Sequence, residues 1–180
     1  MRKPVLTGLL IASVAALIGL FFVMRTTINQ SGDRSVPAAA RNVTVNLDGQ
    51  SFSLRDGVAV QPAAPGSATT NTVRIVGEPA VGDATGEGEQ DVALLIANDP
   101  GGSGTFYYAV LAVNHGGAYQ ATNAVPLGDR IVPKGIDFTN GHFVYRFLDR
   151  ESGESMAAEP TVDEHVKVNF DPVTNRISVG

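Results

Sequence analysis

The chain has 180 residues, of which 43% are hydrophobic and 17% charged, and its formal net charge is −5. It contains 20 glycines and 10 prolines but no cysteine and no tryptophan. This composition excludes a wholly disordered chain, and the length excludes a multidomain enzyme. The absence of cysteine excludes disulfides, thiolate zinc sites, a thiol nucleophile and a lipidated amino-terminal cysteine.

An uncharged, apolar run occupies residues 5–24, after Arg2 and Lys3 and directly before Arg25. As a helix rising about 1.5 Å per residue it spans about 30 Å, the thickness of the hydrocarbon core of a bilayer. The alternative is a cleaved signal peptide, but its apolar region would be only about 7–15 residues long. The nearest Ala-x-Ala sequence, at 38–40, also lies well beyond the run.

We therefore predict an uncleaved, single-pass signal-anchor helix at 5–24 that holds the protein in the cell membrane. Positive charge is concentrated beside the amino terminus, so we expect residues 1–4 to be a cytoplasmic tail. The carboxy-terminal domain would then lie outside the cytosol, in the periplasm or the extracellular space.

The polar segment 25–42 follows and is typical of a flexible spacer. Residues 1–41 hold five of the 13 basic residues and one of the 18 acidic residues. Residues 42–180 therefore hold 8 basic and 17 acidic residues, a net charge of −9. Because such a domain repels phosphate backbones, we expect no nucleic-acid partner.

From residue 43 the chain consists of short apolar stretches separated by turns. Val43, Val45 and Leu47 alternate with polar residues, and Asp48-Gly49 predicts a two-residue hairpin turn. Asp56-Gly57 predicts a second turn. The segment 61–72, rich in Pro, Ala, Gly, Ser and Thr, is predicted to be a loop inside the domain.

The body of the domain follows this loop and also lacks a sustained helical period. Asn140-Gly141 predicts a hairpin, after which Phe143, Tyr145 and Phe147 share one face that we expect to be buried. One short helical turn fits at 151–160. Strands are expected at 73–76, 91–97, 106–113, 118–125, 165–170 and 177–179, with 106–113 as a central buried strand.

These elements predict one compact, mainly β domain at 43–180, built as an antiparallel meander or sandwich behind one transmembrane helix.

The segment 82–91 contains the strongest pattern for a bound ion. Asp83, Thr85, Glu87 and Asp91 supply oxygens at relative positions 1, 3, 5 and 9, with Gly88 at position 6. Calcium loops need hard oxygen ligands on alternate residues and a glycine at the sharp turn. The segment resembles the D-x-D-x-D-G-x-x-D loops that precede strands in integrin-type propeller repeats.

These four residues are therefore a possible calcium site, with Ca²⁺ as the only cofactor that the sequence suggests. Two departures from the pattern weaken the site. Thr85 replaces an Asp or Asn, and Glu87 is one methylene longer than Asp. The alternative is a solvated acidic turn that has kept the shape of such a loop without the ion.

The glycine-rich segment 98–105 is interpreted as a turn between strands. A phosphate-binding loop needs a following Lys-Ser/Thr and a helix, whereas Thr105 leads into a predicted strand. A nucleophile elbow needs Gly-x-Ser-x-Gly, and the last position of that pattern around Ser103 is also Thr105.

Several ordered segments together resemble a group of uncharacterised bacterial envelope proteins. The acidic loop is followed by Val-Ala-Leu-Leu at 92–95, by Pro-Gly-Gly-Ser-Gly-Thr-Phe-Tyr-Tyr at 100–108 and by Leu-Gly-Asp-Arg at 127–130. The segments 122–125 and 156–162 continue the likeness. The loop of the group reads more like G-D-L-N-G-D-G-x-x-D, so the present loop is degenerate. The resemblance implies a small anchored or secreted β-rich domain and implies no reaction.

Other polar residues carry weaker signals. The histidines 115, 142 and 165 form no metal-binding pair, and His165 is expected on the surface. Asp129-Arg130 is interpreted as a turn acid with a local ion pair rather than a substrate-positioning pair.

Two functions remain open from the sequence. The first is a non-catalytic binding or structural module of the cell envelope, with an envelope protein or polymer as partner. The alternative is a small envelope hydrolase or transferase that uses paired carboxylates, such as Asp99 and Asp129.

Overall fold

Two-residue turns set the register of the hairpins. In the computed structural model, which describes residues 35–180, both residues of Asp48-Gly49, Asp56-Gly57 and Asn140-Gly141 have φ between 49° and 85°. These are the left-handed conformations of a type I′ turn, which Asp, Asn and Gly adopt at low cost. The three turns predicted from the sequence are therefore confirmed.

The described residues form one compact unit, Ser35–Gly180. It is mainly β and its strand pairs are antiparallel, which confirms the predicted fold class at this level. The elements in chain order are η1, a 3₁₀ helix (Ala38–Arg41), β1 (Thr44–Leu47), β2 (Gln50–Ser53), β3 (Val58–Pro62), β4 (Thr70–Ile75), β5 (Ala80–Gly82), β6 (Asp91–Asp99), β7 (Phe106–His115), β8 (Ala118–Ala121), β9 (Val125–Asp129), β10 (Val132–Thr139), β11 (His142–Asp149), β12 (Val162–Asp171) and β13 (Arg176–Val179).

The hairpin of β6 and β7 is the centre of a seven-stranded sheet. Each of these two long strands pairs with two shorter strands along its outer edge. β4 and β5 pair with β6, β8 and β9 pair with β7, and β3 pairs with β4. Since β6 is buried on both faces from Asp91 to Asn98, its near-continuous apolar sequence is explained.

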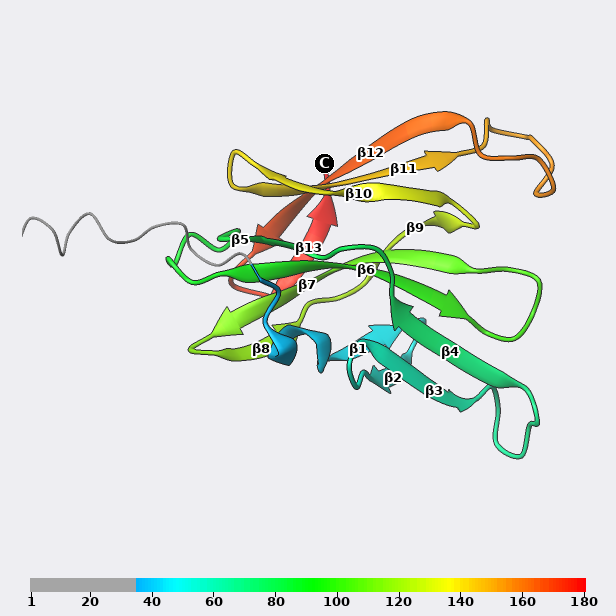
Figure 1. Cartoon of the computed structure of the whole chain (residues 1–180), viewed down its shortest axis with the longest axis horizontal. Coiled ribbons are helices and arrows are strands. Elements are labelled where there is room, and N and C mark those ends of the chain that lie inside the picture. The colour runs from blue at the N-terminus through cyan, green and yellow to red at the C-terminus, as the bar shows by residue number, and fades with distance from the viewer. Residues whose placement is uncertain (1–34) are drawn as a thin grey trace, which may run out of the picture. The chain divides into compact units, whose positions relative to one another are not determined.

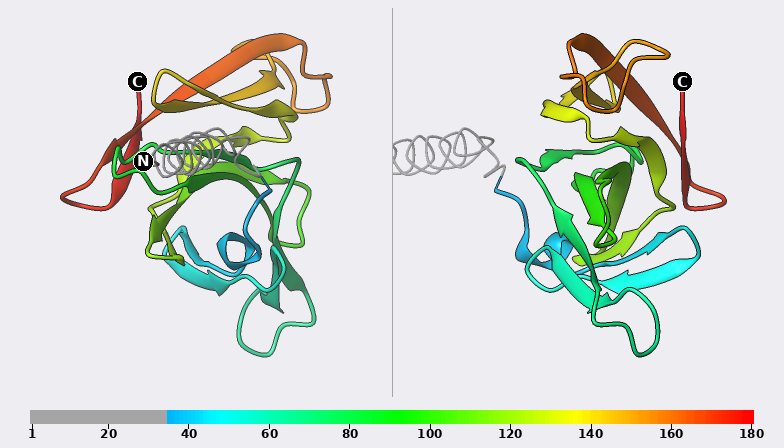
Figure 2. Two further views of the ribbon diagram at one scale, coloured as in Figure 1. Left: turned by 60° about the vertical axis from the view of Figure 1, so that its left-hand side comes forward. Right: turned by 90° about the vertical axis from the view of Figure 1, so that its right-hand side faces the viewer.

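Each face of the β6–β7 hairpin packs into its own hydrophobic core. On one face, residues such as Leu94, Ile96 and Val110 contact η1 and the β1–β2 hairpin. On the other face, Leu95 and Leu111 contact the four-stranded sheet β10–β11–β12–β13. Figure 1 shows that sheet lying over the central one, and Figure 2 shows the central sheet curving around η1 and the β1–β2 hairpin.

The predicted aromatic face of β11 is buried against the central sheet. Phe143, Tyr145 and Phe147 are between 0% and 4% exposed, which confirms their assignment to the core. The hydroxyl of Tyr145 lies 2.9 Å from the carbonyl oxygen of Val110 and 3.2 Å from that of Leu94. Burial raises the pKa of Tyr145, and the two carbonyls satisfy its hydroxyl in the core.

The structure places the start of the folded unit earlier than the sequence analysis did. Residues 35–42 belong to this unit, whereas the whole of 25–42 was predicted to be a spacer. Val36 packs against the first core, and Ala40 in η1 is fully buried. Small apolar side chains can cover a core without giving a strong hydrophobic period, so this segment looked like a linker.

Two further boundaries differ from the predictions. The expected loop 61–72 is strand at both ends, since β3 extends to Pro62 and β4 begins at Thr70. Proline is tolerated there because β3 is an edge strand. The expected strand 118–125 is broken after Ala121, where the N–H and hydroxyl of Thr122 both bond the backbone of Leu111. Residues 151–160 form turns and no helix.

The predicted transmembrane helix 5–24, the tail 1–4 and the first part of the spacer lie outside the described residues. Within 35–180 there is no helix of the length and apolarity needed to cross a membrane.

Candidate functional site

The acidic loop between β5 and β6 is closed by its own backbone amides. Asp83 Oδ1 accepts hydrogen bonds from the N–H of Gly86 at 2.6 Å, the N–H of Glu87 at 3.1 Å and the hydroxyl of Thr85 at 3.3 Å. Asp83 Oδ2 accepts one from the N–H of Gly88 at 2.9 Å. Desolvation would raise the pKa of Asp83, but these hydrogen bonds outweigh it and hold the pKa below its usual value.

Asp91, the first residue of β6, also holds this loop through hydrogen bonds. Its side chain is fully buried, and Oδ2 accepts hydrogen bonds from the N–H groups of Ala84 at 3.0 Å and Thr85 at 3.1 Å. Oδ1 accepts a third, from the N–H of Asn114 in β7, at 3.0 Å. A buried carboxylate is tolerated when hydrogen bonds satisfy it, so Asp91 joins the acidic loop to the end of β7.

The structure brings Asp83, Thr85 and Asp91 together through hydrogen bonds within the loop. All four carboxylate oxygens of the two aspartates face N–H donors, and the hydroxyl of Thr85 donates its proton to Asp83. Glu87 contributes its backbone N–H.

Among residues 35–180, no group of three or more acidic or histidine side chains is placed to hold a metal ion. This arrangement favours the alternative, an acidic turn closed by its own amides, and calcium binding stays a prediction.

The two carboxylates of the enzymatic alternative, Asp99 and Asp129, are not brought together. Asn98, Phe106 and Asp129 are successive partners across β6, β7 and β9, so their side chains lie on one face of the sheet. Asp99 follows Asn98 in β6 and therefore points to the opposite face. Its carboxylate accepts a hydrogen bond from the N–H of Gly101 at 3.0 Å, so Asp99 holds a local turn.

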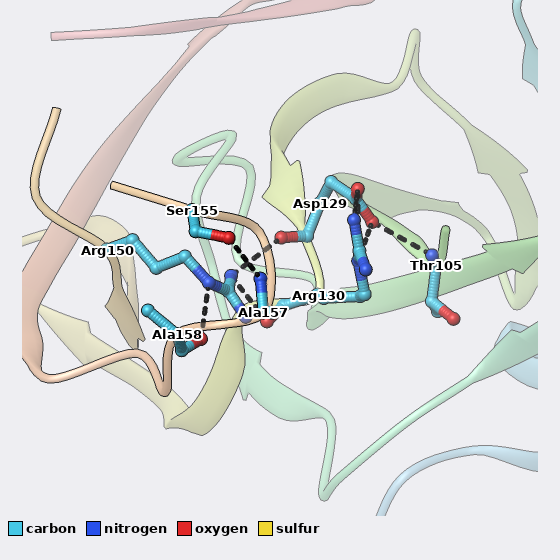
Figure 3. A network of polar contacts seen from close by, with 7 residues as sticks. All are labelled: Thr105, Asp129, Arg130, Arg150, Ser155, Ala157 and Ala158. Carbon is cyan, nitrogen blue, oxygen red and sulfur yellow. Dashed lines mark hydrogen bonds and ion pairs between the residues drawn. The ribbon is translucent and has the colours of Figure 1, made fainter. Parts of the chain in front are cut away.

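Asp129 and Arg130 form an ion pair at the end of β9 (Figure 3). Arg130 Nη2 lies 3.0 Å from Asp129 Oδ2, and the N–H of Thr105 donates to Asp129 Oδ1 at 2.9 Å. Arg150, which follows β11, donates to the carbonyl oxygens of Asp129 in β9 at 3.4 Å, of Arg130 at 3.3 Å and of Ala158 at 2.7 Å. The guanidinium of Arg150 thus joins the two sheets, a role that no local sequence pattern indicated.

The three histidines lie on separate elements. His115 and His165 are exposed, which confirms the expected surface position of His165, and His142 is half-buried at the start of β11.

A second polar cluster, which the sequence analysis missed, lies at one end of the core between the central sheet and the β1–β2 hairpin. We call it the polar end and define it by Asp48, Asn71, Asn98, Phe106 and Tyr108. The hydroxyl of Tyr108 donates to Asp48 Oδ2, at the tip of the hairpin, at 2.7 Å. Burial, and then the hydrogen bond and charge of Asp48, raise the pKa of Tyr108 to about 12, while a hydrogen bond with Asn98 acts in the opposite direction.

Two asparagines of the polar end are almost completely buried. Asn71 in β4 is 7% exposed and Asn98 in β6 is 6% exposed. The Oδ1 atom of each is buried without a hydrogen-bond partner. A sequence signal existed for Asn98, because it is a polar residue on a face of β6 that is otherwise apolar.

Two shallow grooves, of about 340 and 350 Å³, lie at sheet edges away from the polar end. The first groove lies between β2 and β3. The second groove lies beside the bulge of β10 and the connection between β4 and β5. Residues that line the first include Ser51, Ser53, Arg55 and Val60, and residues that line the second include Val76, Leu95, Lys134 and Ile136.

Comparison of the chain with models of protein families, with curated proteins and with solved structures finds no match in any of the three. No family is assigned on this basis, so the function has to be inferred from the sequence and the geometry of the unit.

Proposed function

We propose that the chain is a membrane-anchored module of the bacterial cell envelope that binds a partner outside the cytosol and catalyses no reaction. The uncharged run at 5–24, preceded by two basic residues, supports the anchor. The net charge of −9 on residues 42–180 supports a soluble unit that does not bind nucleic acid. The resemblance of the ordered segments to bacterial envelope proteins supports the compartment.

The observation that carries the binding function is the polar end. It holds an aromatic side chain, Phe106, that is 40% exposed, beside the hydrogen-bonded pair Tyr108 and Asp48. Binding sites typically place a few polar groups beside an apolar surface on a rigid scaffold. Two antiparallel sheets packed through a shared core supply such a scaffold and support a sandwich-like architecture.

The distribution of carboxylates supports a non-catalytic module over the hydrolase or transferase. General acid–base catalysis needs two groups that reach one substrate from suitable positions. Asp99 and Asp129 point to opposite faces of the sheet, and Asp129 is paired with Arg130. Asp83 and Asp91 accept hydrogen bonds from backbone amides.

The anchor and the compartment can be tested by cysteine labelling, because the natural chain has no cysteine. Ser152→Cys places a thiol on an exposed turn of the unit, and Lys3→Cys places one in the predicted tail. In intact bacterial cells, a membrane-impermeant maleimide should label the full chain carrying Ser152→Cys. It should label the Lys3→Cys chain only after permeabilisation.

The full chain should also stay with membranes after washing at alkaline pH. Labelling of the Ser152→Cys chain only after lysis, or a mature protein that begins after residue 24, would contradict the proposed function.

A further inference from the structure

The hairpin between β2 and β3 is closed only next to its turn. Arg55 and Val58 exchange two backbone hydrogen bonds, of 2.9 and 3.1 Å, on either side of Asp56-Gly57. Beyond this pair the two strands separate, because β2 pairs with β1 whereas β3 pairs with β4. The groove of about 340 Å³ lies in the opening between them.

The two walls of this groove are strand edges with free backbone groups. In antiparallel pairs, successive residues direct their N–H and C=O groups to opposite sides of the strand. The N–H of Leu54 bonds the chain just before β1, and the N–H of Ile75 bonds the turn just before β3. With the strand registers, these bonds direct the backbone groups of Ser53 in β2 and Val60 in β3 into the groove. No strand within residues 35–180 pairs with either edge.

The residues at the open end keep the groove from closing. Continued along the hairpin, the register of Arg55 with Val58 would pair Ser51 with Pro62. Proline has no N–H to donate to the carbonyl oxygen of Ser51. The Nε2 atom of Gln61 donates to that oxygen instead, at 3.0 Å. A side chain therefore spans the gap that a backbone hydrogen bond would have closed.

Two arginines lie at the closed end of the groove. Arg55, Val58 and Arg74 are successive partners across β2, β3 and β4, so their side chains share one face. Neither arginine forms an ion pair with any other residue of 35–180. The net charge of residues 42–180 is −9, so this end of the groove is a local positive region in an acidic unit.

From this geometry we infer that the groove binds an extended, acidic segment of a partner protein as an added strand. The inference goes beyond the proposed function, because it adds a peptide site that is separate from the polar end. The free backbone groups of Ser53 and Val60 hydrogen-bond the segment, as in other cases of strand addition. Val58 and Val60, which are 44% and 59% exposed, contact its apolar side chains, and the two arginines attract its carboxylates.

A second copy of the chain fits the groove less well than a flexible segment. Exposed strand edges can pair between two copies of one chain. The groove, however, has two edges to satisfy, one on β2 and one on β3. The strand β3 of another copy has only one free edge, since its other edge is paired with β4. The occupant therefore has to be a single strand with both edges free.

The test uses the purified full chain in detergent and a library of random ten-residue peptides displayed on phage. Peptides that alternate apolar and polar residues and carry Asp or Glu should be enriched. A synthetic copy of the most enriched peptide should bind in fluorescence anisotropy with a Kd of about 0.1 mM or tighter. Because carboxylates meet exposed arginines, binding should weaken in about 0.5 M salt.

Val60→Pro and Val60→Thr form a matched pair of variants. Proline removes the N–H of residue 60, which points into the groove and is not used by β4, so the fold should tolerate it. Threonine keeps that N–H and a branched side chain. Binding of the peptide should fall at least about tenfold in Val60→Pro and stay within about twofold in Val60→Thr.

Arg55→Glu tests the charge without altering the strand edge. The side chain of Arg55 is exposed, so the melting temperature should stay the same. Binding should weaken at least about tenfold, because a charge-assisted contact is replaced by repulsion, and Arg55→Lys should keep most of the binding.

The proposal would be overturned if no peptide is enriched, or if Val60→Pro and Arg55→Glu bind the peptide as the natural chain does. Self-association of the chain that Val60→Pro abolishes, measured by analytical ultracentrifugation without peptide, would assign the groove to a second copy and also reject the proposal. External labelling of the Ser152→Cys chain tests the proposed function by itself, so either idea can fail while the other stands.

Discussion

The side-chain amide of Asn123 links the two sheets, because it hydrogen-bonds the backbone of one β13 residue as a neighbouring strand would. It lies in the break between β8 and β9, where its Nδ2 donates to the carbonyl oxygen of Ile177 in β13 at 3.0 Å. Its Oδ1 accepts the N–H of Ile177 at 2.7 Å. Ile177 is only 4% exposed, so the removal of the amide leaves two backbone groups without a partner in a dry environment.

We predict that Asn123→Ala lowers the free energy of unfolding by about 2–4 kcal/mol. Two hydrogen bonds contribute about 1 kcal/mol each, and unpaired buried groups raise the cost further. For a unit of this size the melting temperature should fall by roughly 6–12 °C. Asn123→Asp should also be destabilised at pH 7, because it keeps the acceptor for the N–H of Ile177 but places a negative oxygen beside its carbonyl.

Urea unfolding of a polypeptide of residues 35–180, followed by circular dichroism, measures this change. Gln120→Ala serves as the control, since Gln120 is an exposed residue of β8 and its loss should change stability by no more than about 0.5 kcal/mol. If Asn123→Ala matches that control, the amide does not hold the two sheets together, and the assigned link between β13 and the central sheet is wrong.

Three other changes test the core, the polar end and the acidic loop. Gly82→Ala should destabilise the unit by about 1–3 kcal/mol, because a Cβ atom there would meet the Phe138 ring, and Phe138→Ala in the same chain should relieve part of the loss in thermal unfolding. Asp48→Asn should lower the pKa of Tyr108 from about 12 towards 10, seen by ultraviolet titration. Because the pKa of Tyr108 is raised in the folded state, this tyrosine stabilises the fold below about pH 10, and that stabilisation is lost between about pH 10 and 12. An unchanged titration curve in Asp48→Asn would contradict the contact between Asp48 and Tyr108. Millimolar Ca²⁺ should leave the melting temperature unchanged, since the carboxylates of the acidic loop 82–91 already accept backbone N–H groups; a rise would establish the calcium site.

Local chemistry explains why much of the fold could be predicted from the sequence. Asp48-Gly49 and Asn140-Gly141 are type I′ turns because Asp, Asn and Gly tolerate positive φ, and this preference depends on few neighbours. The alternation of Phe143, Tyr145 and Phe147 identified a buried face because side chains on a strand repeat every two residues. Each of these signals involves residues that are only a few positions apart in the chain.

The features that could not be predicted depend on residues far apart in the chain. The hairpin tip at Asp48 meets Tyr108 in the folded unit, and the amide of Asn123 meets Ile177. The stretch 118–125 has the composition of one strand, and only the approach of Leu111 to Thr122 shows where it breaks. Arg150 gave no signal because its acceptors are backbone carbonyls, which every residue carries.

The acidic loop and the polar end occupy opposite ends of the β6–β7 hairpin, and this separation makes them independent. Asp91 begins β6 and bonds Asn114 near the end of β7, whereas Asn98 and Phe106 face each other where β6 ends and β7 begins. The length of β6 between Asp91 and Asn98 corresponds to about 24 Å. Substitutions so far apart, without shared partners, should have additive effects on stability. An effect of Ca²⁺ on the titration of Tyr108 would therefore have to pass along the β6–β7 hairpin, and its absence is the expected result.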